Sequence, residues 1–129
     1  MTRELEAPPF VLDASHVLRY ATLDPGPRGW RSAVVVNGVP MGSADLAGVA
    51  IVEALLDGTV YLLHCNERWE TLSATQVPDV ESAEREAATT YGDALAAWTE
   101  YRPLTEEEQA EIRTTRAFLR DLATEEFGG

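Results

Sequence analysis

The chain has 129 residues and a formal net charge of −12 at pH 7, with 45% hydrophobic and 25% charged residues. This length suits one domain with a single real core, and the composition excludes a disordered chain. No apolar run approaches the roughly 20 residues that a membrane helix needs, and the negative charge opposes binding to nucleic acid or anionic lipid. We therefore expect no nucleic acid and no membrane among its partners.

The N-terminal segment and the single cysteine bear on organisation and compartment. Residues 1–15 mix acids with two prolines, which predicts an N-terminal arm followed by a single α+β domain over 16–129. Acids stand where a signal peptide has basic residues before an apolar stretch. Cys65 is the only cysteine, so no internal disulfide can form, which fits a reducing compartment. Together these features predict a cytoplasmic location.

Two strands are expected in the first third of the domain, at 17–23 and 30–36, separated by a stretch of alternating Pro and Gly. Asn37-Gly38 then favours a hairpin, because both residues tolerate positive φ. Pro40 follows this turn and lacks an N–H to donate. We therefore expect the returning strand to be a short edge strand or a bulge.

The middle of the chain predicts a second hairpin, with Asp57-Gly58 as its two-residue type I′ turn. With this turn, Val52 would face Leu63 across the two strands. Side chains alternate between the faces of a strand, and both faces of this hairpin are mostly apolar. A strand pair of this kind is typical of the centre of a sheet that is covered on both sides.

The C-terminal part is predicted to hold one more strand and the helices. A strand is expected at 71–77, and Asp79 is a good N-cap for a helix over 80–91 with Gly92 at its C′ position. The segment 94–101 stays open between helix and strand, since its alanines favour the first and its aromatic residues before a proline favour the second.

A longer helix closes the chain. Thr105 and Glu108 form a capping box, which predicts a helix at about 106–125. Its apolar stripe contains Ile112, Leu119 and Leu122, with Phe118 beside them. The predicted fold is therefore α+β: an antiparallel sheet of about five strands with the Asp57-Gly58 hairpin at its centre, packed by two helices at about 80–91 and 106–125.

Few residues suggest catalysis. In the predicted register Glu53 and His64 are diagonal neighbours, and a carboxylate beside an imidazole could work as an acid–base pair. Cys65 follows His64 directly, but adjacent strand residues point to opposite faces, so they form no nucleophile–base dyad. His16 and His64 are the only histidines and no metal-binding spacing occurs. We expect no metal, no cofactor and, on balance, no enzyme.

Acidic residues concentrate towards the C-terminus, where residues 79–129 carry 13 acids and five Arg, against nine acids and five Arg in residues 1–78. Such a surface either keeps the protein in solution or attracts a basic protein. Glu107 and Glu111, four apart on one helical face, and Trp69, in a polar turn that predicts partial exposure, are the candidate partner-binding residues.

The function predicted from these features is a non-enzymatic, acidic protein–protein interaction module. Its size and charge suit an inhibitor or immunity-type binder of a basic partner. This analogy rests on size and charge alone, since no motif supports it. The alternative is a small-molecule-binding protein or modest enzyme with a pocket around Glu53 and His64. A homodimer would follow if one face of the central hairpin had no cover within the monomer.

Overall fold

The computed structural model describes the backbone of residues 6–24, 30–36 and 39–127, and the side chains of residues 6–24 and 45–124. The strands are β1 (Val11–Leu12), β2 (Ser15–Thr22), β3 (Trp30–Val36), β4 (Val39–Leu46), β5 (Gly48–Ala54), β6 (Val60–Cys65), β7 (Thr71–Val77) and β8 (Thr99–Glu100). The helices are α1 (Val80–Tyr91), a short 3-10 turn η1 (Gly92–Ala94) and α2 (Glu106–Phe127).

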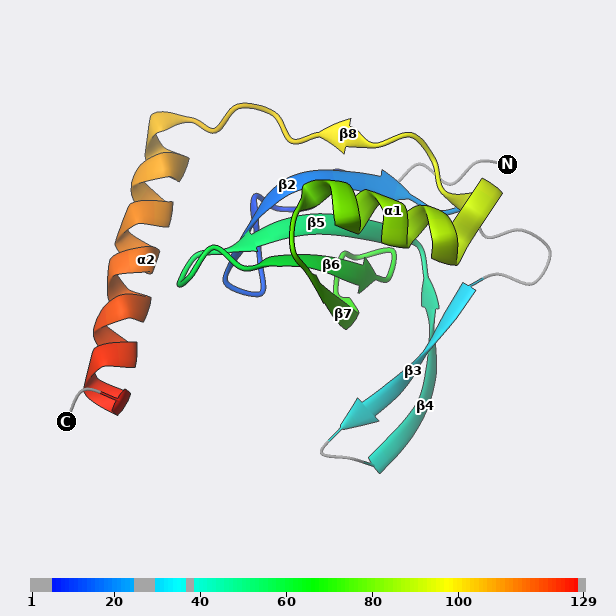
Figure 1. Cartoon of the computed structure of the whole chain (residues 1–129), viewed down its shortest axis with the longest axis horizontal. Helices are drawn as coiled ribbons and strands as arrows, with labels where there is room; N and C mark the ends of the chain where they lie inside the picture. The colour runs from blue at the N-terminus through cyan, green and yellow to red at the C-terminus, as the bar shows by residue number, and fades with distance from the viewer. Residues whose placement is uncertain (1–5, 25–29, 37–38, 128–129) are drawn as a thin grey trace.

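The main sheet is antiparallel, with strand order β1-β2-β5-β6-β7 and β8 added beside β2. It curls, and α1 lies across one of its faces (Figure 1). The β5–β6 hairpin occupies the middle of this order. The predicted α+β class and the central position of the hairpin are therefore confirmed.

The strands β3 and β4 form a separate two-stranded antiparallel sheet that projects from the body (Figure 1). Val36 pairs with Val39, as a hairpin at this point requires, although the turn residues Asn37 and Gly38 lie outside the described residues. The strand β4 has eight residues and is not short, but its pairing with β3 shifts between Ser43 and Pro40, which agrees with the expected bulge. Both strands of a two-stranded sheet are edges, so a missing N–H can face away from the partner.

The loop of the central hairpin differs from the predicted two-residue turn. Val52 pairs with Tyr61 instead of Leu63, and the N–H of Ala54 donates to the carbonyl of Thr59 at 2.8 Å. The loop is therefore longer, and only its Gly58 has a positive φ, of 76°. The loop has four residues, 55–58, and is closed by a hydrogen bond from the Gly58 N–H to the Ala54 carbonyl at 2.9 Å. The pairing moves by two residues, so each side chain keeps its predicted face.

A turn with two left-handed residues occurs instead between β1 and β2. Asp13 and Ala14 have φ values of 50° and 56°, and they join the paired residues Leu12 and Ser15. This is the pattern of a type I′ hairpin. Ala is a poor residue for that conformation, because its Cβ crowds the backbone there. Asp13-Ala14 is therefore not recognisable as a hairpin turn from residue types alone.

Both faces of the sheet are buried, as the double-sided apolar pattern predicts. The face under α1 contains Val49, Ile51, Leu62, Ala83, Ala87 and Tyr91, among others. The opposite face contains Val17, Ala50, Val52, Leu63, Cys65 and Trp69, with Tyr20 and Tyr101 packed against them. Burial of this apolar surface is the main force that holds the fold together.

The described part of the predicted N-terminal arm is packed into the domain. Pro8 is fully buried, and its carbonyl accepts a hydrogen bond from the Tyr101 hydroxyl at 2.8 Å. The carbonyl of Glu6 accepts one from Trp69 Nε1 at 2.6 Å. The start of this segment therefore packs against the second sheet face, and its later part forms β1 and the turn into β2, instead of a loose lead-in.

The helix α1 begins and ends where the sequence predicts. The side chain of Asp79 accepts a hydrogen bond from the N–H of Ser82 at 2.8 Å, and Gly92 follows the helix with a φ of 54°. The segment 94–101, for which the sequence allowed either helix or strand, is mostly irregular. The 3-10 turn η1 ends at Ala94, and the short strand β8 then pairs with β2.

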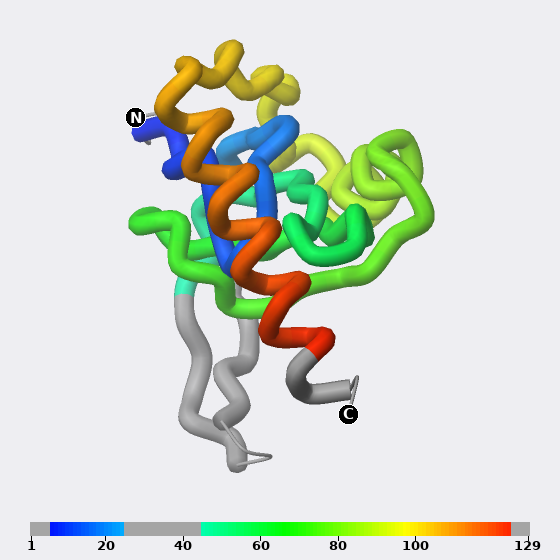
Figure 2. The backbone as a smooth tube through the Cα atoms, turned by 90° about the vertical axis from the view of Figure 1, so that its left-hand side faces the viewer, coloured from blue at the N-terminus to red at the C-terminus, as the bar shows by residue number. Residues whose placement is uncertain are grey.

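The helix α2 crosses one end of the strands, beside the β5–β6 loop, rather than lying over a face of the sheet (Figures 1 and 2). Ile112 is its one buried apolar residue among the described side chains, and Leu119 is half-buried. Leu122, from the predicted stripe, is 45% exposed, and Phe118, beside the stripe, is 60% exposed. Only part of the stripe is therefore buried against the domain.

Candidate functional site

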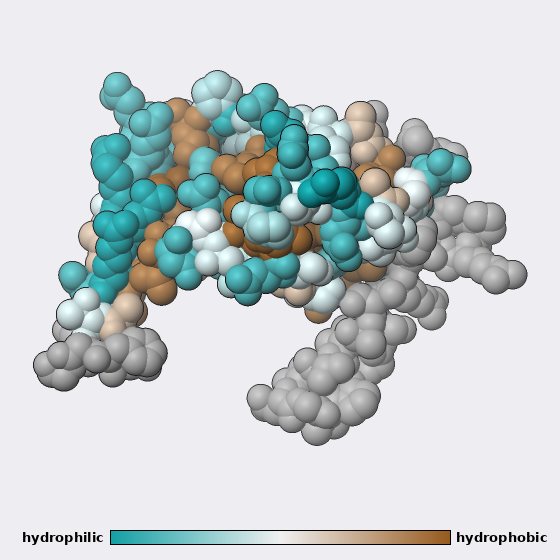
Figure 3. All heavy atoms as spheres, viewed as in Figure 1, coloured by the Kyte–Doolittle hydropathy of each residue, from teal (hydrophilic) through white to brown (hydrophobic). Residues whose placement is uncertain are grey.

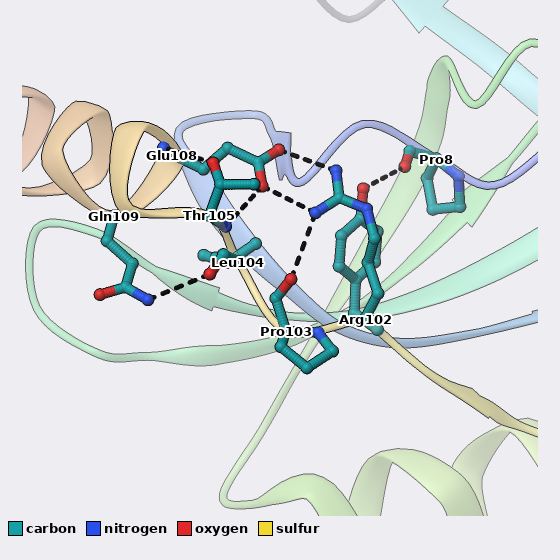
Figure 4. A network of polar contacts seen from close by, with 8 residues as sticks. Pro8, Arg102, Pro103, Leu104, Thr105, Glu108 and Gln109 are labelled. Carbon is teal, nitrogen blue, oxygen red and sulfur yellow. Dashed lines mark hydrogen bonds and ion pairs between the residues drawn. The ribbon is translucent and has the colours of Figure 1, made fainter.

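The start of α2 is fixed by the predicted capping box. The N–H of Glu108 donates to Thr105 Oγ1 at 3.1 Å, and the N–H of Thr105 donates to Glu108 Oε1 at 2.9 Å. Arg102 adds two hydrogen bonds to the same carboxylate, at 2.7 and 2.8 Å (Figure 4). These bonds lower the pKa of Glu108 to about 2 and keep it charged. The direction in which α2 leaves the domain is thereby set.

Glu107 and Glu111 are both exposed on α2, four residues apart, as the helical pattern predicts. Residues with this spacing are neighbours on one side of a helix. The buried Ile112 faces the body, so the two carboxylates are presented to solvent. In Figure 3 the outer side of α2 is mostly hydrophilic, and hydrophobic atoms lie between the helix and the sheet.

The next turns of α2 carry the exposed apolar pair. Phe118 and Leu122 are also four residues apart, and both remain largely in water. Close to them on the helix, Arg116 Nε donates to the carbonyl of Leu55 at 3.0 Å and ties α2 to the β5–β6 loop. The helix therefore offers acids along its first turns and large apolar side chains further on, from one anchored element.

The prediction that Trp69 is partly exposed is wrong. Its side chain is only 5% exposed and contacts Tyr20 edge-to-face at a centroid distance of 5.9 Å. Its backbone has a φ of 60°, and its Nε1 donates to the Glu6 carbonyl. Burying an indole with its N–H satisfied is favourable. Trp69 is a core residue and presents no surface to a partner.

Glu53 and His64 do not meet. Glu53 pairs with Val60 on one side and with His16 on the other. His64 pairs with Val49, four residues before Glu53 on β5, which separates the two side chains by roughly 13 Å at about 3.3 Å per residue. The error follows from the register, which a two-residue turn had placed differently. The alternative function, a pocket around these two residues, loses its basis.

His64 instead belongs to a buried polar cluster under α1. Its Nδ1 lies 2.5 Å from the Tyr91 hydroxyl and its Nε2 lies 3.2 Å from Thr75 Oγ1. Burial lowers the pKa of His64 against the opposing effect of Glu86, and burial raises the pKa of Tyr91 to about 12. Both ring nitrogens are engaged within the fold. The cluster satisfies buried polar atoms and is suited to a structural role.

Cys65 is buried on the opposite sheet face, among the residues around Trp69. Burial raises the pKa of its thiol to about 12. A nucleophilic cysteine needs an accessible thiolate, so this thiol is inert at neutral pH. The predicted separation of His64 and Cys65 onto two faces is confirmed.

Two hollows flank the β5–β6 loop. One, of about 290 Å³, lies between this loop and Arg116 and Arg120 of α2, and Glu53 also lines it. The other, of about 360 Å³, lies between the Asp13–Ala14 turn, the loop and Leu119 of α2. The second could not be foreseen, because neither its turn nor the position of α2 was predicted.

Comparison of the chain with known protein families, with curated proteins and with solved structures finds no match. Within the described ranges, no helix is long and apolar enough to span a membrane. Among those same residues no three His, Cys, Asp or Glu side chains gather in a way that could hold a metal ion. The candidate site is therefore defined by the geometry of α2 and its surroundings.

Proposed function

We propose that the protein is a non-enzymatic interaction module that binds a basic protein through α2, as an inhibitor does. The observation that carries this proposal is the pairing, on one helix, of exposed Glu107 and Glu111 with exposed Phe118 and Leu122. Exposed aromatic and aliphatic side chains are typical of the centre of a protein interface. Carboxylates beside them favour a partner with basic residues.

The dimensions and attachment of α2 support this proposal. Its 22 residues span roughly 33 Å at 1.5 Å per residue, which is long enough to contribute to an interface of ordinary size. The capping box and the Arg116–Leu55 hydrogen bond hold the helix in place before any partner arrives. A helix that is already ordered loses less entropy on binding.

Capture from the native cell tests the proposal. The wild-type chain is used as bait in a cytoplasmic extract, because a lone buried cysteine suits a reducing compartment. A second bait carries Glu107→Arg and Glu111→Arg, and a third carries Glu81→Arg and Asp93→Arg at exposed acids around α1. All three are compared by quantitative mass spectrometry.

We expect a basic protein that the wild-type and third baits enrich and the second bait does not. The third bait has the same change in net charge, so it separates a local contact from general attraction. Equal enrichment on all three baits would mean that the acids of α2 serve only solubility. Enrichment of nucleic acid or acidic proteins would also contradict the proposal.

A further inference from the structure

The hollow between the Asp13–Ala14 turn, the β5–β6 loop and Leu119 combines an apolar lining with two acids. It lies where the Asp13–Ala14 turn, the β5–β6 loop and the C-terminal half of α2 meet, and we name it the Asp13–Asp57 hollow. Its volume is about 360 Å³. Its lining residues are Asp13, Ala14, Ser15, Ala54, Leu56, Asp57, Tyr61, Leu63, Ala74 and Leu119.

The lining is apolar in most places. Tyr61 and Leu63 come from β6, Ala74 from β7 and Leu119 from α2. Leu56 is 41% exposed beside them. These side chains suit the aliphatic part of an incoming side chain, since its burial removes apolar surface from water.

The two acids are exposed and come from different loops. Asp13 belongs to the left-handed turn between β1 and β2, and Asp57 to the β5–β6 loop. The N–H of Thr59 donates to Asp57 Oδ1 at 3.0 Å, which orients that carboxylate and lowers its pKa. The turn of Asp13 is held by the Ser15 hydroxyl, which donates to the Asp13 carbonyl at 3.2 Å. The hollow is thus an apolar space beside one oriented carboxylate, that of Asp57, and beside a second acid, Asp13, on an ordered turn.

We propose that the Asp13–Asp57 hollow receives an arginine side chain of the basic partner, with its aliphatic stem against Tyr61 and Leu119 and its guanidinium beside the two carboxylates. This inference rests on the proposed function and names the anchor for it. Leu119, which lines the hollow, follows Phe118 directly on α2, so the hollow lies at the same level of the helix as the exposed apolar pair.

The chemistry of the lining selects arginine over other side chains. A neutral apolar side chain would take the two carboxylates out of water without a partner, which is costly. A lysine ammonium is compact and strongly hydrated, whereas a guanidinium is planar, weakly hydrated and able to bond two acceptors at once. It also stacks well on an aromatic ring such as that of Tyr61.

A titration followed by amide NMR tests the anchor on the full chain. The probe is the capped tripeptide acetyl-Leu-Arg-Leu-amide, and the matched probes replace Arg with citrulline, its neutral isostere, or with Lys. We expect the Arg probe to shift the amides of Asp13, Ala14, Asp57 and Leu119. It should bind at least about tenfold more tightly than the citrulline probe, because citrulline has nearly the same shape and lacks the positive charge that pairs with the carboxylates.

Variants locate the binding. Asp13→Asn and Asp57→Asn should each weaken the Arg probe severalfold, while Asp93→Asn, an exposed acid in η1, should leave it unchanged. An Asn at position 57 still has an oxygen to accept the Thr59 N–H, so the loop keeps its shape. Spectra of each variant show directly whether the fold is retained.

Equal binding of the Arg and citrulline probes, or shifts that do not respond to Asp13→Asn, would overturn the inference. Lys binding as tightly as Arg would overturn the choice of arginine. The outcome is separable from the proposed function. If the hollow binds no probe but charge reversal at Glu107 and Glu111 still abolishes capture, the inference fails and the proposed function stands. If the hollow binds the Arg probe but charge reversal does not affect capture, the hollow is a binding site and the role proposed for the acids of α2 is rejected.

Discussion

Gly48 lies directly against the ring of Trp69. A Cβ added to Gly48 would stand 2.7 Å from Trp69 Cη2 and 2.8 Å from Cζ3, well inside van der Waals contact. The ring has little freedom to move, because its Nε1 donates to the Glu6 carbonyl at 2.6 Å and its backbone has a φ of 60°. The glycine at the start of β5 thus makes room for a tryptophan contributed by the β6–β7 turn.

This contact predicts that Gly48→Ala destabilises the protein. The added methyl group over-packs the site, and such changes cost about 1–3 kcal/mol in a well-packed core. Urea unfolding measures the change in the free energy of unfolding. In a Trp69→Leu background the same substitution should cost clearly less, because the two positions are coupled through this contact. An equal cost in both backgrounds would show that the ring is not the obstacle.

A second prediction concerns the left-handed turn. Ala14→Gly should stabilise the protein by about 0.5–1 kcal/mol. A left-handed backbone is unfavourable for Ala by about 1–2 kcal/mol, and Gly removes this strain. Part of the gain is lost because Gly also raises the conformational entropy of the unfolded chain. Ala88→Gly, on the exposed side of α1, is the matched control and should destabilise by about 1 kcal/mol. If both substitutions lower the midpoint of thermal unfolding, position 14 does not have the left-handed conformation.

The polar cluster under α1 gives a third prediction. Tyr91→Phe removes the hydroxyl beside His64 Nδ1 and leaves a buried ring nitrogen without that partner. Such a loss costs about 1–3 kcal/mol. Tyr61→Phe, at a half-buried side chain, should cost much less in the same urea unfolding experiment. Equal effects would mean that the His64–Tyr91 contact contributes nothing to stability.

The histidines predict the fourth result, a loss of stability in mild acid. Burial lowers the pKa of both His16 and His64 from 6.5. In mild acid the unfolded chain therefore binds more protons at these histidines than the native state does. The associated stability is complete above about pH 6.5 and is lost as the pH falls towards the native pKa values. NMR titration should place both native pKa values below those in urea. His16→Asn should make the loss between pH 7 and pH 5 shallower; native pKa values at or above 6.5 would contradict this.

Local signals in the sequence predicted much of the fold. The ends of helices are set by hydrogen bonds between a capping residue and nearby backbone, so a few residues suffice to identify these ends. Asp79 and Gly92 mark the two ends of α1, and Thr105 and Glu108 mark the start of α2. The two-sided apolar pattern of β5 and β6 likewise required a central position. Features of this kind depend on near neighbours in the chain.

The features that were missed depend on distant residues. Asp57-Gly58 fits a two-residue turn, yet the hairpin opens into a longer loop whose Leu55 is almost fully buried and bonded to Arg116 of α2. Trp69 follows polar residues but finds its place against Gly48 and Tyr20. The hollow requires Asp13 and Leu119 to meet, and no local pattern links them.

The central claim, that α2 recognises a basic protein by charge, is tested most directly by association kinetics with the captured partner. We expect the association rate of the wild-type chain to fall at least about tenfold between about 0.1 M and 1 M NaCl, as the screening length drops from about 10 Å to about 3 Å. The Glu107→Arg, Glu111→Arg variant should associate more slowly at low salt and show a flatter dependence. An association rate that does not change with salt concentration would contradict the claim. So would an equal loss of association rate in the Glu81→Arg, Asp93→Arg variant.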